Sequence, residues 1–476
     1  MTRALTLHND RLFSSDPLQR SIAQRLYAEV KALPIISPHG HTDPQWYADD
    51  MAFPDPARLF IVPDHYVFRM LYSQGIALDD LGVPGADGNV PEAKPREIWR
   101  LFARNAHLFR GTPTRMWLDH VFYEVFGIRE RLDADSADRI YDAIAAQLET
   151  PAFRTRALMD RFRIEKIATT ESPLDTLPHH AKMKAEGKGW SGPGGRVVTA
   201  YRPDPVADPE FTGFRENVAR FGELAHEDTS TWEGYLRAHR NRREYFKSMG
   251  ATSTDHGHPT ASTRDLEPAE ASALYAKALD GRLSAAEAET FRGQVLTEMA
   301  AMSLDDGLVM QIHPGSFRNH NALLFERYGR DKGADIPTAT DYVHDLKPLL
   351  DRFGNERDFT LVLFTLDETS YSRELAPLAG HYPALRLGPP WWFHDSPEGM
   401  LRFRKQAIET AGFYNTVGFN DDTRAFMSIP ARHDVARRID CRALAELVVE
   451  HRIEEDEARE VAVDLAYNLA KRAYKL

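Results

Sequence analysis

The chain has 476 residues, of which 42% are hydrophobic, so it can bury a large core. Its net charge of −12 argues against general nucleic-acid binding and against a basic membrane-binding surface. Cys441 is the only cysteine, so no intrachain disulfide can form, and no segment approaches transmembrane length. The first ten residues lack the apolar core of a signal peptide, and we therefore expect a globular cytoplasmic protein.

The N-terminal part predicts one helix followed by one strand. The helix begins at Asp16-Pro17, because aspartate caps helix N-termini and proline suits the first helical position. The apolar run 33–36 predicts a strand that leads into His39 and His41. Alternate side chains of an extended segment share a face, so these two imidazoles point the same way. Together they can hold a divalent metal, although the His-x-His spacing also arises by chance.

Residues 50–165 are predicted to form a large helical insertion after the first strand, because their apolar residues recur with helical periodicity. Trp99, Trp117 and Phe122 lie on the apolar faces and are expected to be core residues. Residues 64–69, within this insertion, carry polar side chains that packing does not explain. This short segment therefore stands apart from the expected core.

From residue 164 onward, apolar strand-like runs alternate with helical segments, and polar residues follow nearly every run. The seven runs span 164–170, 195–201, 250–253, 308–312, 359–366, 385–387 and 416–419. With run 33–36 they make eight candidate strands, which predicts a single (β/α)8 barrel over residues 1–476. An open doubly wound sheet is the alternative. The barrel is preferred because its active sites lie at the C-terminal ends of the strands, where the polar residues occur.

Four residues at expected strand ends have the donor atoms of a catalytic zinc site that keeps one position open. They are His39, His41, His313 and Asp422. Two other interpretations stay open: His313 as a buried histidine bonded to backbone, and Asp422 as a helix cap. His256 and His258 form a second His-x-His, which is expected to lie in a loop and not to hold the metal. Asp255 and His256 could nevertheless line the pocket.

Arg202 and Arg424 follow two further expected strands, and a guanidinium in a barrel mouth needs an anionic partner. Either arginine could hold a substrate carboxylate through two hydrogen bonds, or could form an ion pair with Asp204 or Asp422. Residues 251–254 contain no lysine, although binuclear metal hydrolases of this barrel class commonly need a carboxylated lysine there. This absence favours a site with one metal.

Taken together, these motifs resemble the uronate isomerase (glucuronate isomerase) family of the amidohydrolase superfamily, nearly end to end. The resemblance rests on His39-Gly40-His41, Asp64-His65-Tyr66 with Arg69, Thr169-Thr170-Glu171-Ser172-Pro173, Tyr201-Arg202-Pro203-Asp204, Asp255-His256-Gly257, Gln311-Ile312-His313 with Arg318-Asn319-His320-Asn321, Trp391-Trp392-Phe393, and Asp422-Thr423-Arg424-Ala425-Phe426. Three departures are present: Glu171-Ser172 replaces Asp-Asp, Pro314 replaces Ile, and His320 replaces Asn. They are expected at the pocket rim, where they would bear on substrate preference.

The resemblance implies a distorted (β/α)8 TIM barrel of the metal-dependent hydrolase type. It implies interconversion of D-glucuronate with D-fructuronate and of D-galacturonate with D-tagaturonate, by proton movement between C2 and C1 through an enediol. The expected catalytic residues are Asp422, Tyr66, His65 (which would tune the proton affinity of Tyr66) and Arg424. The expected substrate-binding residues are Arg202, Arg424, Trp392, Arg69, Asp255, His256 and Arg318. One divalent metal, expected to be Zn²⁺, would orient hydroxyls without necessarily being essential.

Two other classes of function compete with this expectation. A mononuclear zinc hydrolase on the same barrel would use metal-activated water and would lose all activity when the metal is removed. A non-catalytic sugar-acid binding protein would need no carboxylate placed to move protons. For the isomerase, the expected partner is a small hexuronate, with neither nucleic acid nor membrane. A homo-oligomer is expected, with a trimer as the assembly.

Overall fold

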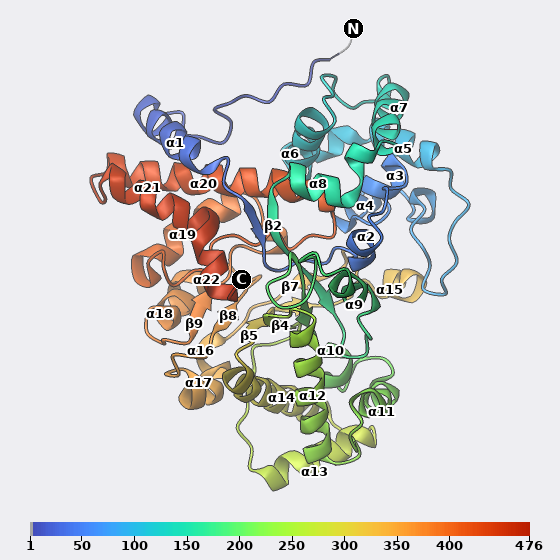
Figure 1. The fold of residues 1–476 in the computed structure, drawn as a ribbon, viewed down its shortest axis with the longest axis vertical. Helices are drawn as coiled ribbons and strands as arrows, with labels where there is room; N and C mark the ends of the chain where they lie inside the picture. The colour runs from blue at the N-terminus through green and yellow to red at the C-terminus, as the bar shows by residue number, and fades with distance from the viewer. Residues whose placement is uncertain (1–2) are drawn as a thin grey trace.

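The computed structural model describes residues 3–476 as a distorted TIM barrel with a large helical insertion (Figure 1). Seven parallel strands form one curled sheet in the order β1-β2-β3-β4-β5-β8-β9. These strands are β1 Ile35–Ser37, β2 Ile164–Glu171, β3 Val197–Tyr201, β4 Ser253–His256, β5 Val309–Ile312, β8 Leu361–Leu363 and β9 Leu385–Leu387. The strands are parallel because a helical crossover returns the chain to the same end of the sheet each time.

The eighth position of the barrel is filled without a regular strand. The expected strand 416–419 makes one parallel bridge, between Thr416 and Leu387 of β9. Gly418 then has a φ of +78°, which ends the extended backbone that a ladder requires. Farther along, the Thr423 carbonyl accepts a hydrogen bond of 3.1 Å from the His41 N–H beyond β1. The prediction of a regular eighth strand was therefore wrong. The segment nevertheless occupies the position of that strand, between β9 and the end of β1.

Helices connect the strands and close the chain. Before β2 these are α1 Pro17–Val30, α2 Pro44–Ala48, α3 Pro56–Phe60, α4 His65–Tyr72, α5 Pro95–Arg104, α6 Pro113–His120, α7 Ala137–Leu148 and α8 Thr155–Arg161. After β2 they are α9 Pro178–Ala185, α10 Asp204–Ala207, α11 Phe214–Ala225, α12 Trp232–Ser248, α13 Pro268–Leu279, α14 Ala285–Asp306, α15 Ala322–Tyr328, α16 Tyr342–Asp345, α17 Lys347–Phe353, α18 Ala376–Ala379, α19 Pro397–Ala411, α20 Ile429–Val449, α21 Glu455–Val463 and α22 Leu469–Tyr474. Within residues 3–476, none of these helices combines the length and hydropathy that crossing a lipid bilayer requires.

The first helix begins where the sequence predicts. The Asp16 carboxylate caps α1 by accepting a hydrogen bond of 2.8 Å from the Gln19 N–H, and Pro17 is the first helical residue. Leu26 and Val30 of α1 are buried in a cluster with Leu444 of α20. The N-terminal helix therefore packs against a helix near the other end of the chain (Figure 1).

Helices α2 to α8 lie between β1 and β2 and form the insertion, in the upper right of Figure 1. This helical region starts earlier than the predicted residue 50, because Asp43 caps a helix that begins at Pro44. It also ends earlier than residue 165, because Ile164 already pairs with Ile35 of β1. The aromatic residues expected in the core are buried, with Trp99 fully enclosed.

Strand β4 begins three residues later than the sequence predicts. It was expected at 250–253, but it runs from Ser253 to His256, so Asp255 and His256 lie within the strand. The positive φ of Gly250, +102°, ends α12 and delays the start of the strand. The expectation that His256 lies in a loop was therefore wrong.

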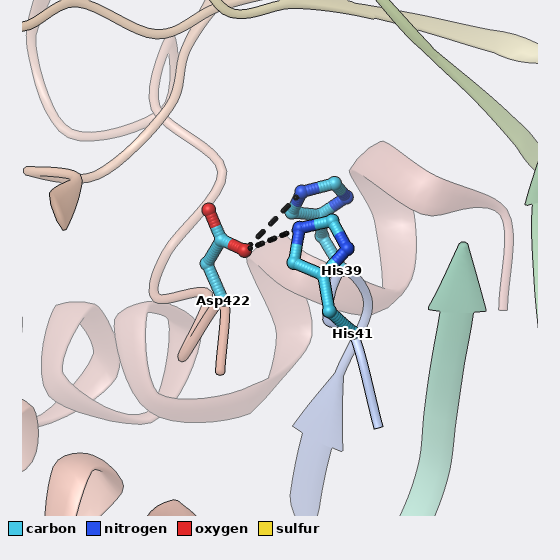
Figure 2. A group of neighbouring side chains, drawn as sticks. All are labelled: His39, His41 and Asp422. Carbon is cyan, nitrogen blue, oxygen red and sulfur yellow. Dashed lines mark ion pairs between the residues drawn. The ribbon is translucent and has the colours of Figure 1, made fainter. Parts of the chain in front are cut away.

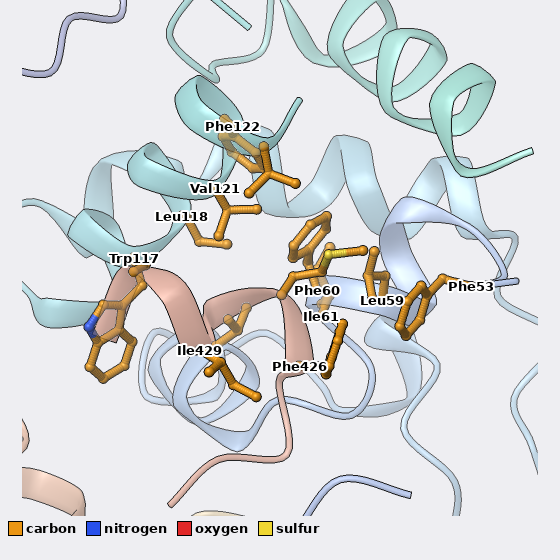
Figure 3. Packing of buried hydrophobic residues seen from close by; sticks show 14 of the residues in the cluster. Phe53, Leu59, Phe60, Ile61, Trp117, Leu118, Val121, Phe122, Phe426 and Ile429 are labelled. Atoms are coloured by element: carbon orange, nitrogen blue, oxygen red, sulfur yellow. The ribbon is translucent and has the colours of Figure 1, made fainter. Parts of the chain in front are cut away.

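One aromatic cluster joins the insertion to the loop that carries Asp422 and Arg424 (Figure 3). Phe426, fully buried, stacks on Phe53 with ring centroids 5.8 Å apart. It also meets Tyr47 edge-on at 6.0 Å. This packing fixes the polypeptide two residues beyond Arg424 against helices of the insertion.

A second excursion, residues 316–337, borders the same end of the barrel. It consists of the antiparallel pair β6 Ser316–Phe317 and β7 Ile336–Pro337, with α15 between them. Its base is closed by Asp335, which accepts hydrogen bonds from Arg318 at 3.1 Å and from the Asn319 N–H at 2.6 Å. The side chains of Arg327 and Tyr328 both bond to Asp79 at 2.9 Å. The excursion is therefore tied to the insertion.

Replacing Phe426 with alanine should lower the free energy of unfolding by about 3–5 kcal/mol, because it leaves a cavity in a packed cluster. It should also speed hydrogen exchange at the His41 amide, since the Phe426 ring holds the segment that supplies the Thr423 carbonyl. Phe126→Ala is the matched control: Phe126 is similarly buried and stacks on Phe153 at 5.0 Å, within the insertion. Equal His41 exchange in both variants would contradict this account.

Candidate functional site

A cavity of about 820 Å³ opens at the C-terminal ends of the strands. Its wall takes residues from the segments after β1, β2, β3, β4, β5 and β9, from the insertion, and from the 316–337 excursion. The lining residues expected from the sequence are His39, His41, His65, Tyr66, Arg202, His313, Arg318, Trp392, Asp422 and Arg424. The location agrees with the position of active sites in barrels of this kind.

Three side chains that line this cavity converge on one another, two from the segment after β1 and one from the last loop (Figure 2). His41 Nε2 lies 3.0 Å and His39 Nε2 lies 3.5 Å from Asp422 Oδ1. His39 also stacks on His313, with ring centroids 4.8 Å apart, and His313 Nδ1 lies 2.7 Å from Asp255 Oδ1. Imidazole and carboxylate donors are thus gathered from β1, β4, β5 and the last loop.

These residues fit a divalent metal. Two overlapping groups, His39 with His41 and Asp422, and His39 with Asp255 and His313, each bring their donor atoms within 4.8 Å of one another. Within residues 3–476, His39 Nδ1 and His313 Nε2 are buried without a hydrogen-bond partner, whereas His313 Nδ1 faces Asp255. Buried polar atoms are nearly always paired, so donors left free around one point are what a metal site requires.

The backbone around the histidines is fixed from two sides. The Thr170 hydroxyl of β2 donates a hydrogen bond of 2.9 Å to the Gly40 carbonyl, and the His41 N–H donates to Thr423. Asp422 itself has a φ of +39°, in the left-handed region that few residues other than glycine adopt. Its carboxylate faces the imidazoles. The alternative that Asp422 caps a helix is therefore not the arrangement in this structure.

The carboxylates of the site are ionised. Burial opposes ionisation of Asp422, but His39, His41 and His313 outweigh it and hold the pKa of Asp422 well below its usual range. Burial also opposes ionisation of Asp255, which Arg202 and the nearby imidazoles overcome, so its pKa too lies well below the ordinary value. Burial lowers the pKa of His41, although Asp422 acts in the opposite direction. Burial also lowers the pKa of His313, and the neutral form of an imidazole is the one that binds a metal.

Both expected arginines lie in the cavity wall, each beside an acid. Arg202 bonds to Asp204 at 2.8 Å and to Asp255 at 3.0 Å, as the ion-pair interpretation allowed. Arg424 pairs with Asp331 at 2.9 Å and not with Asp422. Each guanidinium keeps further N–H groups with which it can bind an anion.

Helix α4 brings His65 and Tyr66 to the cavity. The Asp64 carboxylate caps this helix by accepting a hydrogen bond of 2.8 Å from the Tyr66 N–H. The His65 ring stacks on Trp392, with centroids 5.4 Å apart and planes at 6°. Burial raises the pKa of Tyr66 well above its usual value, although Arg432, whose guanidinium lies 5.3 Å from the ring, opposes the rise. The Arg69 guanidinium lies 5.9 Å from the same ring, so two cations lie beside the phenol. Burial lowers the pKa of His65 to about 3.

Three expected substrate-binding residues lie behind the cavity wall. His256 is fully buried, and its Nε2 lies 3.1 Å from the Thr254 hydroxyl. Asp255 is equally buried and reaches the cavity only through Arg202 and His313. The Arg69 guanidinium lies 5.1 Å from the Phe393 ring. The sequence could not separate Asp255 and His256 from wall residues, because β4 begins three residues later than predicted.

Comparison with known proteins identifies the group to which this architecture belongs. The model of the glucuronate isomerase family matches residues 10–474. The chain belongs to this family. A uronate isomerase from Phenylobacterium zucineum is 68% identical over 476 residues, covering 100% of this chain and 98% of the relative. Two solved structures cover 98% or more of both chains: a Caulobacter crescentus glucuronate isomerase (61% identity, TM-score 0.97) and a Thermotoga maritima uronate isomerase (28%, 0.90).

Membership in the glucuronate isomerase family disfavours the alternative of a mononuclear zinc hydrolase, since the match runs across the whole chain. It also directs attention to the three departures from the family pattern. Ser172 lines the cavity as expected. Glu171 instead points away from the cavity and is buried against Thr199 of β3, and His320 is exposed beside Phe317. Of the four departing residues, Ser172 lines the cavity, whereas Glu171, Pro314 and His320 do not.

Several wall residues were not predicted from the sequence. His258 lines the cavity, and both of its buried ring nitrogens lack hydrogen-bond partners within residues 3–476. Arg330 and Asp331 reach the wall from the 316–337 excursion. The excursion carries no strand-end signal, because only its antiparallel pair is extended, and its two strands are two residues long. Only the tertiary fold brings it to the cavity.

His41→Gln should weaken Zn²⁺ binding by at least about tenfold, because even loss of a residue that orients a ligand costs this much. The matched control is His258→Gln, which alters the second His-x-His and also lines the cavity. Metal analysis of purified protein and calorimetric Zn²⁺ titration would compare the two. Equal loss in both variants would place the metal elsewhere.

Glu171→Gln should stabilise the protein at about pH 8, by up to ~4 kcal/mol, and much less at about pH 5. Burial raises the pKa of Glu171 from 4.5 to about 8 in the folded protein. The stability that this proton gives is therefore complete below about pH 4.5 and is lost as the pH rises to about 8. Glutamine resembles the protonated acid and removes this loss.

Thermal unfolding at several pH values measures this difference. Glu165→Gln, on the same strand, is the control, because Glu165 pairs with Lys471 at 2.7 Å and glutamine should bring no gain at pH 8. A Glu171→Gln curve parallel to that of the unmodified protein would refute the assignment.

Proposed function

We propose that the cavity interconverts the aldose and ketose forms of hexuronates, D-glucuronate with D-fructuronate and D-galacturonate with D-tagaturonate. The observation that carries this proposal is the presence, in one cavity, of an ionised carboxylate among imidazoles and of several guanidiniums. A hexuronate has a reactive carbonyl at one end and a carboxylate at the other. The carboxylate and imidazoles suit proton transfer at the carbonyl end, and the guanidiniums suit the sugar carboxylate.

The reaction sets three requirements on the residues. The sugar ring opens, and a proton then moves between C2 and C1 through an enediol. The site must therefore supply a group that takes and returns a proton, a hydrogen-bond donor for the carbonyl oxygen, and an anchor for the distant carboxylate. Each requirement corresponds to residues in the cavity wall.

Asp422 is the base in this proposal. It is ionised and lies on the loop closest to His39 and His41, so it can accept a proton from a sugar hydroxyl during ring opening. Tyr66 has a raised pKa and is therefore a neutral phenol, able to donate a proton or a hydrogen bond to the substrate. Arg432 beside the ring would stabilise the phenolate if the proton leaves.

Arginines anchor the substrate carboxylate. Arg202, Arg318 and Arg424 all line the cavity, and a guanidinium binds a carboxylate through two parallel hydrogen bonds. Trp392 supplies an apolar face, held by the stacked His65 on one side and by Arg318, whose guanidinium lies 5.7 Å from the ring. We assign His256 no contact with substrate, since it lies behind the wall.

We propose that the bound metal is one zinc ion, held by His39, His41 and Asp422 with His313 nearby. Nitrogen and oxygen donors of this kind suit zinc, and neutral imidazoles with an ionised carboxylate are its preferred partners. When bound, the metal would orient substrate hydroxyls and polarise the carbonyl. The residues that bind, orient and move protons are otherwise those of the chain itself.

We also propose that the protein works in the cytoplasm as a homo-oligomer, with a trimer as the assembly. A single cysteine, buried and unpaired, suits a reducing compartment. Phe317, Leu323 and Ile336 of the 316–337 excursion expose about half of their surface, which suits contact with another subunit.

Asp422→Asn and Tyr66→Phe should each lower kcat by about a hundredfold or more, since each removes a group that transfers a proton. The assay follows ketose formation and solvent-hydrogen incorporation from D-glucuronate and D-galacturonate, before and after chelation. Tyr72→Phe, at the other end of α4, is the control and should leave turnover unchanged. Near-normal turnover in either test variant would remove that residue from the mechanism, and absence of ketose from the unmodified protein would overturn the proposed function.

A further inference from the structure

Asp331 is the one acid of the 316–337 excursion that reaches the cavity within the described residues 3–476. It follows α15, and its Oδ2 lies 2.9 Å from Nη2 of Arg424. Both side chains are about half exposed, 48% for Asp331 and 42% for Arg424. A molecule entering the cavity can therefore reach this pair without unfolding the wall.

The charges around Asp331 are mainly positive. Burial opposes its ionisation, but Arg424, Arg202 and Arg318 outweigh burial and hold the pKa of Asp331 below its usual range. All three of these arginines line the cavity, as does Arg330. Asp331 thus places a carboxylate among the cations to which the proposed function assigns the substrate carboxylate.

The backbone holds this carboxylate in place. Asp331 has a φ of +61°, in the left-handed region that aspartate tolerates better than most residues. Two residues later, Gly333 has a φ of +69° and lies so close to α4 that a Cβ would be 3.0 Å from Arg69 Cβ and 3.2 Å from the His65 carbonyl. Asp335 then closes the excursion on Arg318. The turn that bears Asp331 is therefore packed against the helix of Tyr66 and is anchored at its base.

We propose that Asp331 is a built-in counterion of Arg424, which the carboxylate of a sugar acid displaces on binding, so that Asp331 competes with anionic sugars for Arg424. The inference rests on the proposed function, because it assumes that the substrate brings its own carboxylate. An anionic sugar replaces one ion pair with another, so Arg424 stays paired. A neutral sugar that displaced Asp331 would leave Arg424 without an anion.

Because Asp331 competes with the sugar carboxylate for Arg424, it lowers the affinity of the cavity for anionic sugars. Half-exposed ion pairs contribute little, so removing the competing carboxylate should tighten binding of a sugar acid about three- to fivefold. Binding of a neutral sugar amide should change less, because it forms no ion pair with Arg424. The sign of this effect separates the counterion from a residue that binds sugar hydroxyls, since loss of such a residue would weaken binding of both.

The test compares Asp331→Asn with the unmodified zinc-loaded protein by calorimetry, using D-glucarate and D-glucuronamide as probes. D-Glucarate has carboxylates at both ends and no aldehyde, so it binds without turnover. We expect tighter D-glucarate binding in Asp331→Asn, little change for the amide, and unmodified affinity in Asp331→Glu, which keeps the charge. Asp79→Asn is the matched control, because Asp79 pairs with Arg327 of the same excursion at 2.9 Å, outside the cavity wall.

Weaker or unchanged D-glucarate binding in Asp331→Asn would overturn the inference, as would an equal gain for D-glucuronamide or for Asp79→Asn. The proposed function is judged separately by ketose formation in the unmodified protein. If that protein forms ketose while Asp331→Asn binds D-glucarate no more tightly, the function stands and the counterion is wrong. If no ketose forms, the proposed function fails, whatever the calorimetry shows.

Discussion

The site depends on one backbone hydrogen bond between the first and the last segment around the barrel. The hydrogen bond from the His41 N–H to the Thr423 carbonyl joins the segment after β1 to the segment that replaces the eighth strand. It brings the imidazoles of the first segment to the carboxylate of the second, which the left-handed backbone at Asp422 turns toward them. A regular eighth strand would be extended at this point and would alternate its side chains between the two faces of the sheet. This junction between the segment after β1 and the segment that replaces the eighth strand, the seam of the barrel, therefore sets the geometry of the site.

Charge in the cavity is arranged in pairs that leave hydrogen-bonding capacity free. Asp255 binds Arg202 on one side and faces His313 on the other, so it orients both from behind the wall. Asp331 pairs with Arg424 in the cavity wall. Buried ions without partners would be costly, and pairing each one lets the protein keep several cations ready for an anionic ligand. The pairing also explains why an acidic protein, with a net charge of −12, can bind an acidic sugar.

Much of this structure was predictable because local signals and the fold agree. The cap at Asp16, the strand before His39 and the buried aromatic faces around Trp99 follow from short-range patterns that the fold preserves. Predictions failed where one residue changes the backbone path. Gly250 delays β4, so His256 enters the strand and turns from the cavity, and Gly418 ends the eighth run. Asp331 had no signal, because its position depends on how a long excursion folds back on α4.

The seam also has a consequence for how the protein is made. The residues that meet there, His39 and Asp422, stand near opposite ends of the chain. Contacts between residues so distant in sequence form late, because the chain loses much entropy when such a long loop closes. During synthesis the strands up to β9 can be complete when His39 and His41 have been made but Asp422 has not. A chain that has not been synthesised beyond β9 lacks Asp422, so the group of His39, His41 and Asp422 can form only after the last loop has been made.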